Sequence, residues 1–140
     1  MLIDGESLED QYLLQGDVTV VGAGPAGIVV ALELAKAGYE VILVESGGLQ
    51  FSERAQNLGE TPYFDQRVHA AMSQCTRRQI GGTSTIWGGR CVPYDPLDFD
   101  ARSYISDSSW PVSYEEIAKY FQRACDKFFC GDAEFDIRIN

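Results

Sequence analysis

The chain has 140 residues, of which 45% are hydrophobic and 23% are charged, a composition typical of a globular protein and not of a disordered one. Its net charge of −10 argues against nucleic acid or an anionic membrane surface as a partner, because both would repel it. The acidic N-terminus lacks the features of a signal peptide, and no segment is typical of a membrane span. We therefore predict a cytoplasmic protein with no nucleic-acid or membrane partner.

The first elements form a strand–helix–strand pattern. Residues 17–21 (DVTVV) predict a strand, and the helical spacing of IVVALELAKAG after the GAGPAG turn predicts a helix that Gly38 ends. Residues 40–45 (EVILVE) predict a second strand. A short crossover of this kind requires parallel strands, and continuous apolar runs indicate strands covered on both faces. The predicted class is α/β, a Rossmann-like FAD/NAD(P)-binding fold that is incomplete in this chain.

The turn sequence GAGPAG, residues 22–27, is the first motif that carries chemistry. Gly22 would permit the tight turn, Gly24 would let the backbone approach a pyrophosphate, and Gly27 would let the helix lie close to the strand. The helix N-terminus would attract the phosphates, and Glu45 at the end of the second strand would accept the ribose hydroxyls. The same carboxylate would disfavour the 2′-phosphate of NADP. The alternative is a plain glycine turn beside a solvated Glu45.

The rest of the chain is less regular. Residues 50–110 are rich in Gly, Pro, Asp and Ser and predict irregular structure, after which Ser113 and Glu116 form the capping box of a final helix. That helix should end near Gly131, and its apolar stripe is predicted to be core: Ile117, Phe121, Ala124 and Phe128. Only residues 136–139 hint at a third strand, and a two-stranded parallel sheet is not stable by itself. We therefore expect a fragment, or the product of a broken reading frame.

The stretch GGTSTIWGG, residues 81–89, contains four glycines and one tryptophan. Ordering a glycine costs more backbone entropy than ordering other residues, so four glycines within nine residues need a reason. Close approach of the backbone to a ligand would be such a reason. Its amides could form an anion nest for the second half of a flavin cofactor, with Thr83 and Ser84 as further donors. The Trp87 side chain could line the flavin ring or the substrate chamber. The alternative for Trp87 is an ordinary core tryptophan.

Together these motifs resemble the N-terminal part of the glucose-methanol-choline (GMC) oxidoreductases, which are FAD-dependent enzymes that oxidise alcohols and sugars. The resemblance rests on GAGPAG, ESGG, GGTSTIWGG, DPLDFDAR and SWPVSYEEIAKYF, and it runs nearly end to end. Within that family, the chain most resembles the sugar-dehydrogenase and pyranose-oxidase-like branch. The cofactor-binding candidates are Gly22, Gly24, Pro25, Ala26, Gly27, Glu45, Ser46, Gly81, Gly82, Thr83, Ser84 and Trp87.

Two departures from the family pattern matter. Several members carry a histidine just before the tryptophan, which in some bears the flavin covalently, but this chain has Ile86 there. The resemblance therefore implies non-covalent FAD. The family's catalytic histidine lies near the C-terminus of a much longer chain, whereas the one histidine here, His69, matches no family motif. We predict no catalytic residue within the chain and regard His69 as a surface residue.

Other polar residues have simpler interpretations. Arg77 and Arg78 could offset phosphate charge or be solvated, and the sequence does not choose between these. The acidic loop from Tyr94 to Asp100 lacks the pattern of a calcium loop, so no metal site is predicted. The four cysteines have the spacing of neither a zinc site nor a CxxC pair, which suggests reduced thiols: Cys75, Cys91, Cys125 and Cys130.

The predicted organisation has an N-terminal arm (1–16), a βαβ unit (17–50), a flavin-contacting Gly-rich region (51–112), and a final segment of the same domain (113–140). The predicted function is the FAD-binding end of an oxidoreductase acting on CH–OH groups of sugars or alcohols, inactive alone. Two alternatives remain, an NAD-binding enzyme fragment and a non-catalytic remnant.

Overall fold

The computed structural model describes residues 1–60, 65 and 67–135. The chain divides into two compact units, residues 1–88 and 89–140. The four-part organisation expected from the sequence stays a prediction. Among the described residues, no helix has both the length and the apolar character needed to cross a membrane.

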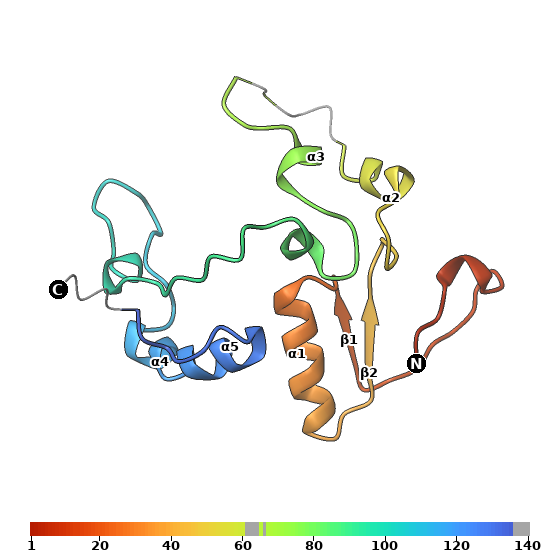
Figure 1. Ribbon diagram of the computed structural model, residues 1–140, viewed down its shortest axis with the longest axis horizontal. Helices are drawn as coiled ribbons and strands as arrows, with labels where there is room; N and C mark the ends of the chain where they lie inside the picture. The colour runs from red at the N-terminus through yellow and green to blue at the C-terminus, as the bar shows by residue number, and fades with distance from the viewer. Residues whose placement is uncertain (61–64, 66, 136–140) are drawn as a thin grey trace. The chain divides into compact units, whose positions relative to one another are not determined.

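The first unit is built on a βαβ motif of strand β1 (Val18–Val21), helix α1 (Pro25–Lys36) and strand β2 (Val41–Val44). The strands are parallel (Figure 1), with Val18 opposite Val41 and Val21 opposite Val44. Gly38 ends the helical segment as predicted, with a positive φ of 94° and its N–H donating to the Ala35 carbonyl at 3.1 Å. The predicted α/β Rossmann-type class is confirmed.

Helix α1 packs along the two strands (Figure 1) and buries Ala31. The expectation that both faces of the strands are covered is wrong for the described residues, because Val21 and Val44 are 82% and 44% exposed. Helix α1 is the only helix in the described part of the chain that packs extensively on these strands. One layer can cover only one face, so apolar strand residues remain open to solvent.

The rest of the first unit is mostly irregular, as predicted, but the sequence did not reveal its short helices. These are α2 (Glu53–Asn57), α3 (Met72–Cys75) and the 3₁₀ helices η1 (Gly5–Ser7) and η2 (Gly82–Thr85). An exposed ion pair of 2.7 Å between Arg54 and Glu6 links α2 to the N-terminal arm.

The second unit contains the 3₁₀ helix η3 (Pro96–Asp98) and helices α4 (Tyr114–Ala118) and α5 (Phe121–Phe128). The predicted capping box is confirmed, since Ser113 Oγ accepts from the Glu116 N–H at 3.2 Å and the Glu116 carboxylate accepts from the Ser113 N–H at 2.8 Å. The single continuous helix predicted after it is wrong. The Tyr120 N–H donates to the Ile117 carbonyl, three residues back, and this tighter turn separates α4 from α5.

The end of α5 also differs from the prediction. Phe129 adopts the left-handed conformation, with φ of 55°, and the Cys130 N–H donates to the Cys125 carbonyl at 3.0 Å. The helix therefore ends before Gly131, whose own positive φ of 85° continues the turn. The strand expected over residues 136–139 lies outside the described residues.

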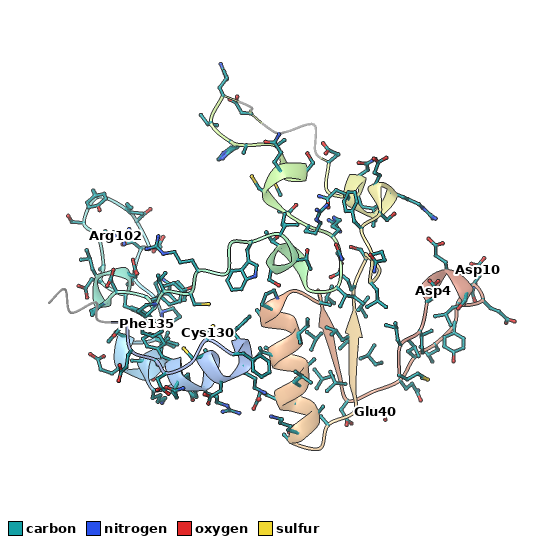
Figure 2. The ribbon with its side chains drawn as sticks, in the orientation of Figure 1. Asp4, Asp10, Glu40, Arg102, Cys130 and Phe135 are labelled. Carbon is teal, nitrogen blue, oxygen red and sulfur yellow. The ribbon has the colours of Figure 1, made fainter. Side chains whose placement is uncertain are left out.

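Aromatic rings form the core of the second unit. Phe99 is 8% exposed, and its ring centroid lies 5.6 Å from that of Trp110 and 5.8 Å from that of Tyr114. Tyr114 contacts Phe121, which in turn contacts Phe135 (Figure 2) at centroid distances of 6.0 and 6.1 Å. Phe121 of the predicted apolar stripe is thus half-buried in this cluster, whereas Ala124 of the same stripe is exposed.

The far end of the predicted apolar stripe is not buried. Phe128, in the last turn of α5, is 39% exposed.

Candidate dinucleotide-binding site

The glycine-rich turn joins β1 to α1 in a tight bend. Gly22 has a φ of 98°, which a residue with a side chain rarely adopts, and its N–H donates to the Val44 carbonyl at 2.7 Å. Ala23 follows and is 2% exposed. Gly24 is the N-cap of α1, with extended backbone, and Pro25 occupies the first helical position. The bend therefore places the start of α1 at the carboxyl end of both strands.

Gly27 and Gly24 are glycines for different reasons. A Cβ on Gly27 would lie 1.9 Å from the Gly22 carbonyl oxygen, so the close approach of helix to turn excludes any side chain. A Cβ on Gly24 would meet no heavy atom within 4 Å. The fold thus requires glycine at position 27, whereas the open space at Gly24 lets a ligand approach the backbone.

The N-terminus of α1 fits a phosphate group. Gly24 provides no side-chain cap, and the first turn contains no acidic residue. The unpaired amides of a first helical turn carry about half a positive charge, which favours an anion. The residues present therefore suit the pyrophosphate of a dinucleotide.

The Glu45 carboxylate braces the turn. Its Oε2 accepts from the Ala23 N–H at 2.8 Å, and its Oε1 accepts from the Gly47 N–H at 3.0 Å and from the Ser46 hydroxyl at 3.2 Å. Partial burial alone raises the pKa of Glu45, but the hydrogen bonds from Ala23, Gly47 and Ser46 outweigh it and hold the pKa below its ordinary value. The alternative of a purely solvated Glu45 is therefore wrong. The sequence motif gave no sign of this bracing role.

We expect Glu45→Gln to destabilise the first unit by about 1–3 kcal/mol, because an amide nitrogen would face a backbone N–H that now meets a carboxylate oxygen. The folded-state pKa of this carboxyl is lower than its pKa in the unfolded chain. Its contribution to stability is therefore complete above the unfolded-state pKa and is lost as the pH falls through the folded-state pKa. The difference in unfolding free energy between wild type and variant should therefore shrink below roughly pH 5. Urea unfolding at several pH values measures it, and a difference that is constant down to pH 2 would contradict the assignment.

The second glycine-rich stretch docks on the first. The Gly81 N–H donates to the Ala23 carbonyl at 2.8 Å, and the Ile80 N–H donates to the Gly48 carbonyl at 3.0 Å. A Cβ on Gly82 would lie 3.0 Å from the Gly24 Cα, and Gly82 is buried. Two motifs nearly sixty residues apart in sequence therefore meet at the N-terminus of α1.

A buried glutamine that the sequence reasoning missed positions this docking segment. Gln56 is 5% exposed, its amide nitrogen donates to the Thr76 carbonyl at 3.1 Å, and its amide oxygen accepts from the Arg78 N–H at 3.1 Å. Gln56 thus acts as a bridge between α2 and residues 76–78. A polar residue in an irregular stretch carries no periodic signal, so nothing in the sequence marks it.

Arg77 and Arg78 are not simply solvated. The Arg77 guanidinium lies 4.2 Å from the centroid of the Phe51 ring. Arg78 donates to the Ser46 hydroxyl at 2.9 Å, and its backbone lies so close to Gly47 that a Cβ there would fall 2.2 Å from the Arg78 carbonyl oxygen. Of the two arginines, Arg78 is thus held beside the candidate ribose-binding strand end.

The segment from Gly82 onward begins with a 3₁₀ helix, and the expected anion nest stays a prediction. Residues 82–85 form η2, in which the Ser84 hydroxyl donates to the Gly81 carbonyl at 2.6 Å and the Thr85 hydroxyl donates to the Gly82 carbonyl at 2.9 Å. Thr83 lies on the exposed surface of this turn. Trp87 is 46% exposed, so it is not an ordinary core tryptophan.

The remaining polar candidates lie outside this arrangement. His69 is exposed, in keeping with its interpretation as a surface residue. In the acidic loop of the second unit, Asp98 accepts from the Asp95 N–H at 2.9 Å and lies 3.5 Å from Arg102 (Figure 2), so these carboxylates cap η3. The described residues contain no cluster of side chains suited to a metal ion.

A parallel βαβ motif with a glycine-rich turn at an uncapped helix N-terminus, and an acidic residue at the end of the second strand, defines a Rossmann-type FAD/NAD-binding domain. The chain belongs to the pyridine nucleotide-disulphide oxidoreductase family, whose family model matches residues 16–128.

The chain also has curated relatives of low identity that are GMC-family oxidoreductases, which confirms the resemblance to that family. The chain is 28% identical over 131 residues to 2-methyl-1,2-propanediol dehydrogenase of Mycolicibacterium austroafricanum, covering 76% of this chain and 23% of the relative. It is 28% identical over 121 residues to paromamine 6'-oxidase of Streptomyces fradiae, covering 75% and 21%. It is 31% identical over 124 residues to oxygen-dependent choline dehydrogenase of Photobacterium profundum, covering 77% and 22%. The chain thus spans between a fifth and a quarter of these relatives, and no solved structure gives a significant match.

Proposed function

We propose that this chain forms the FAD-binding part of an oxidoreductase that takes a hydride from a CH–OH group of an alcohol or sugar. The observation that carries this proposal is the docking of Gly81 and Gly82 on Ala23 and Gly24. A βαβ motif alone accommodates an adenosine diphosphate moiety. A second backbone segment held against the same helix N-terminus extends the surface toward the other half of a longer cofactor. The names of the relatives, which are dehydrogenases and oxidases, support the same class of reaction.

The roles of the residues follow from the contacts. The first turn of α1 would bind the pyrophosphate, with Gly24 leaving room for it. Glu45 would accept ribose hydroxyls with the lone pairs that remain beside its contacts to Ala23 and Gly47. Bound FAD would supply the hydride acceptor. Thr83, exposed within η2, and Trp87, exposed just after it, would contact the flavin half.

NAD is the second candidate cofactor, because the family model that matches the chain describes pyridine nucleotide enzymes. An NAD site would use the same turn and the same Glu45, but it would leave the docking of Gly81 and Gly82 without a ligand to contact. The two cofactors are therefore separable by experiment.

We expect the purified chain to bind FAD, and to release all of it as free flavin on heat or acid denaturation, because Ile86 offers no atom for a covalent bond. Absorbance of the supernatant and precipitate after denaturation measures both. Flavin that stays with the precipitated protein would contradict non-covalent binding. A folded, colourless chain that is stabilised by NAD and not by FAD would favour the NAD-binding alternative.

Gly24→Ala is the matched variant for the site. The added methyl group would meet no protein atom within 4 Å, so the melting temperature should change little, while FAD affinity should fall at least tenfold because the methyl group occupies the pyrophosphate approach. Gly5→Ala is the control, since a Cβ at Gly5 also meets no atom within 4 Å. If Gly24→Ala binds FAD with unchanged affinity, the pyrophosphate of FAD does not bind beside Gly24.

A further inference from the structure

Two cysteines of the second unit lie in direct contact. The Cys91 and Cys130 sulfur atoms are 3.4 Å apart, although the residues are 39 positions apart in sequence. Both are free thiols, with Cys91 half-buried and Cys130 exposed. Figure 2 shows Cys130 just beyond the end of α5. The contact therefore joins the beginning of the second unit to the end of its last helix.

The other two cysteines do not compete for this contact. Cys125 is 5% exposed within α5, so it is the least accessible of the four thiols to an external oxidant. Cys75 is exposed, but it ends α3 in the first unit. Close sulfur atoms that solvent can reach thus occur together only at Cys91 and Cys130 among the described residues.

We propose that Cys91 and Cys130 form a reversible disulfide, a redox-controlled crosslink that closes the second unit. Disulfide formation needs sulfur atoms that can approach each other without a large backbone movement. The van der Waals contact already present meets that condition, and the turn at Phe129 that carries Cys130 is short and exposed.

A low-molecular-weight disulfide such as glutathione disulfide is the oxidant that the step requires. The Cys91 thiolate attacks one sulfur of glutathione disulfide, which forms a mixed disulfide and releases one glutathione thiolate. Cys130 then loses its proton to solvent and attacks the Cys91 sulfur, which releases the second glutathione. Two protein thiols are oxidised, and one glutathione disulfide is reduced to two glutathione molecules.

The electrostatics of the pair favour this order. The hydrogen bond with Cys91, followed by desolvation and the nearby Cys91 and Cys125 thiols, raises the pKa of Cys130, so Cys130 keeps its proton to higher pH. The reactive nucleophile is a thiolate, which makes Cys130 the thiol that acts second.

The crosslink would close a loop of the second unit and restrict its unfolded state. We expect the oxidised chain to melt roughly 10 °C higher than the reduced chain. Addition of dithiothreitol should reverse the shift.

The test incubates the whole 140-residue chain with glutathione disulfide and maps the products by non-reducing digestion and mass spectrometry. The expected product is a single intramolecular Cys91–Cys130 crosslink, with the loss of two hydrogen atoms, in both wild type and Cys75→Ser. Cys130→Ser should instead retain a glutathione adduct on Cys91, and neither Cys130→Ser nor Cys91→Ser should show the rise in melting temperature.

Three results would overturn the proposal. The first is wild-type chain with glutathione on both Cys91 and Cys130. The second is a crosslink to Cys125 in place of this pair. The third is an unreacted pair in samples in which the exposed Cys75 has been modified. A repeat in urea separates native contact from random pairing, since the crosslink should lose its selectivity there.

Discussion

Gly27→Ala is expected to destabilise the first unit by about 3 kcal/mol or more, enough to unfold much of it at room temperature. The methyl carbon would lie 1.9 Å from the Gly22 carbonyl oxygen, and Val20 would be its next neighbour at 3.6 Å. Neither α1 nor the turn can move away cheaply. The Gly22 N–H is tied to the Val44 carbonyl, and the next residue, Ala23, is held by Glu45.

Thermal and urea unfolding of Gly27→Ala, followed by far-UV circular dichroism, measures this effect. Gly24→Ala and Gly5→Ala are matched controls, because the same methyl group enters open space in both. A Gly27→Ala variant as stable as these controls would show that α1 does not lie as close to the turn as the structure has it.

The βαβ motif could be predicted because its determinants are local. An apolar run, a glycine-rich turn, a helical period and Gly38 each fix a few neighbouring residues, and the structure places β1, α1 and β2 within a residue or so of the expected limits at most ends. The capping box of Ser113 and Glu116 was predictable for the same reason, since both partners lie in one turn.

What escaped prediction depends on contacts between distant residues. The bracing of Ala23 by Glu45 and the bridge that Gln56 makes to Arg78 each join residues 22 positions apart. No local pattern encodes such a pairing. The docking of Gly81 on Ala23 is of the same kind, which is why the sequence indicated two glycine motifs but not that they touch.

The break between α4 and α5 escaped for another reason. Residues 114–128 contain no glycine or proline, and the apolar spacing continues from Ile117 to Phe121 across the break. The helix is interrupted by one tighter hydrogen bond, from Tyr120 to Ile117. The rings of Tyr114 and Phe121 contact each other across that break at a centroid distance of 6.0 Å.

The second large effect that we expect is the absence of catalytic activity. The 140-residue chain should oxidise no alcohol or sugar, even in excess FAD. Hydride transfer from an alcohol requires removal of the hydroxyl proton, and a positioned base typically contributes about 10²–10⁴-fold to such a step. His69 is the one histidine of the sequence, and histidine is the side chain that most often serves as a general base.

The structure strengthens that expectation. His69 is exposed, in the segment between α2 and α3, whereas the candidate cofactor site is built around the N-terminus of α1, Glu45 and the Gly81–Gly82 backbone. Glu45 is a poor candidate for the base, because hydrogen bonds from Ala23, Gly47 and Ser46 hold its pKa below the ordinary value. A chain of this composition can hold a cofactor and still lack a group that accepts the substrate proton.

A dye-reduction assay of the FAD-supplemented chain, across a panel of alcohols, sugars and choline, tests this expectation. Oxygen-dependent choline dehydrogenase of Photobacterium profundum, assayed with choline, serves as the positive control. Turnover above the protein-free rate would contradict the prediction, and its loss in His69→Ala would identify the base that we have judged absent. If the wild-type chain instead shows no turnover but binds flavin that denaturation releases, cofactor binding and catalysis are separable. Cofactor binding would then reside in this chain, and proton removal would depend on groups that it does not contain.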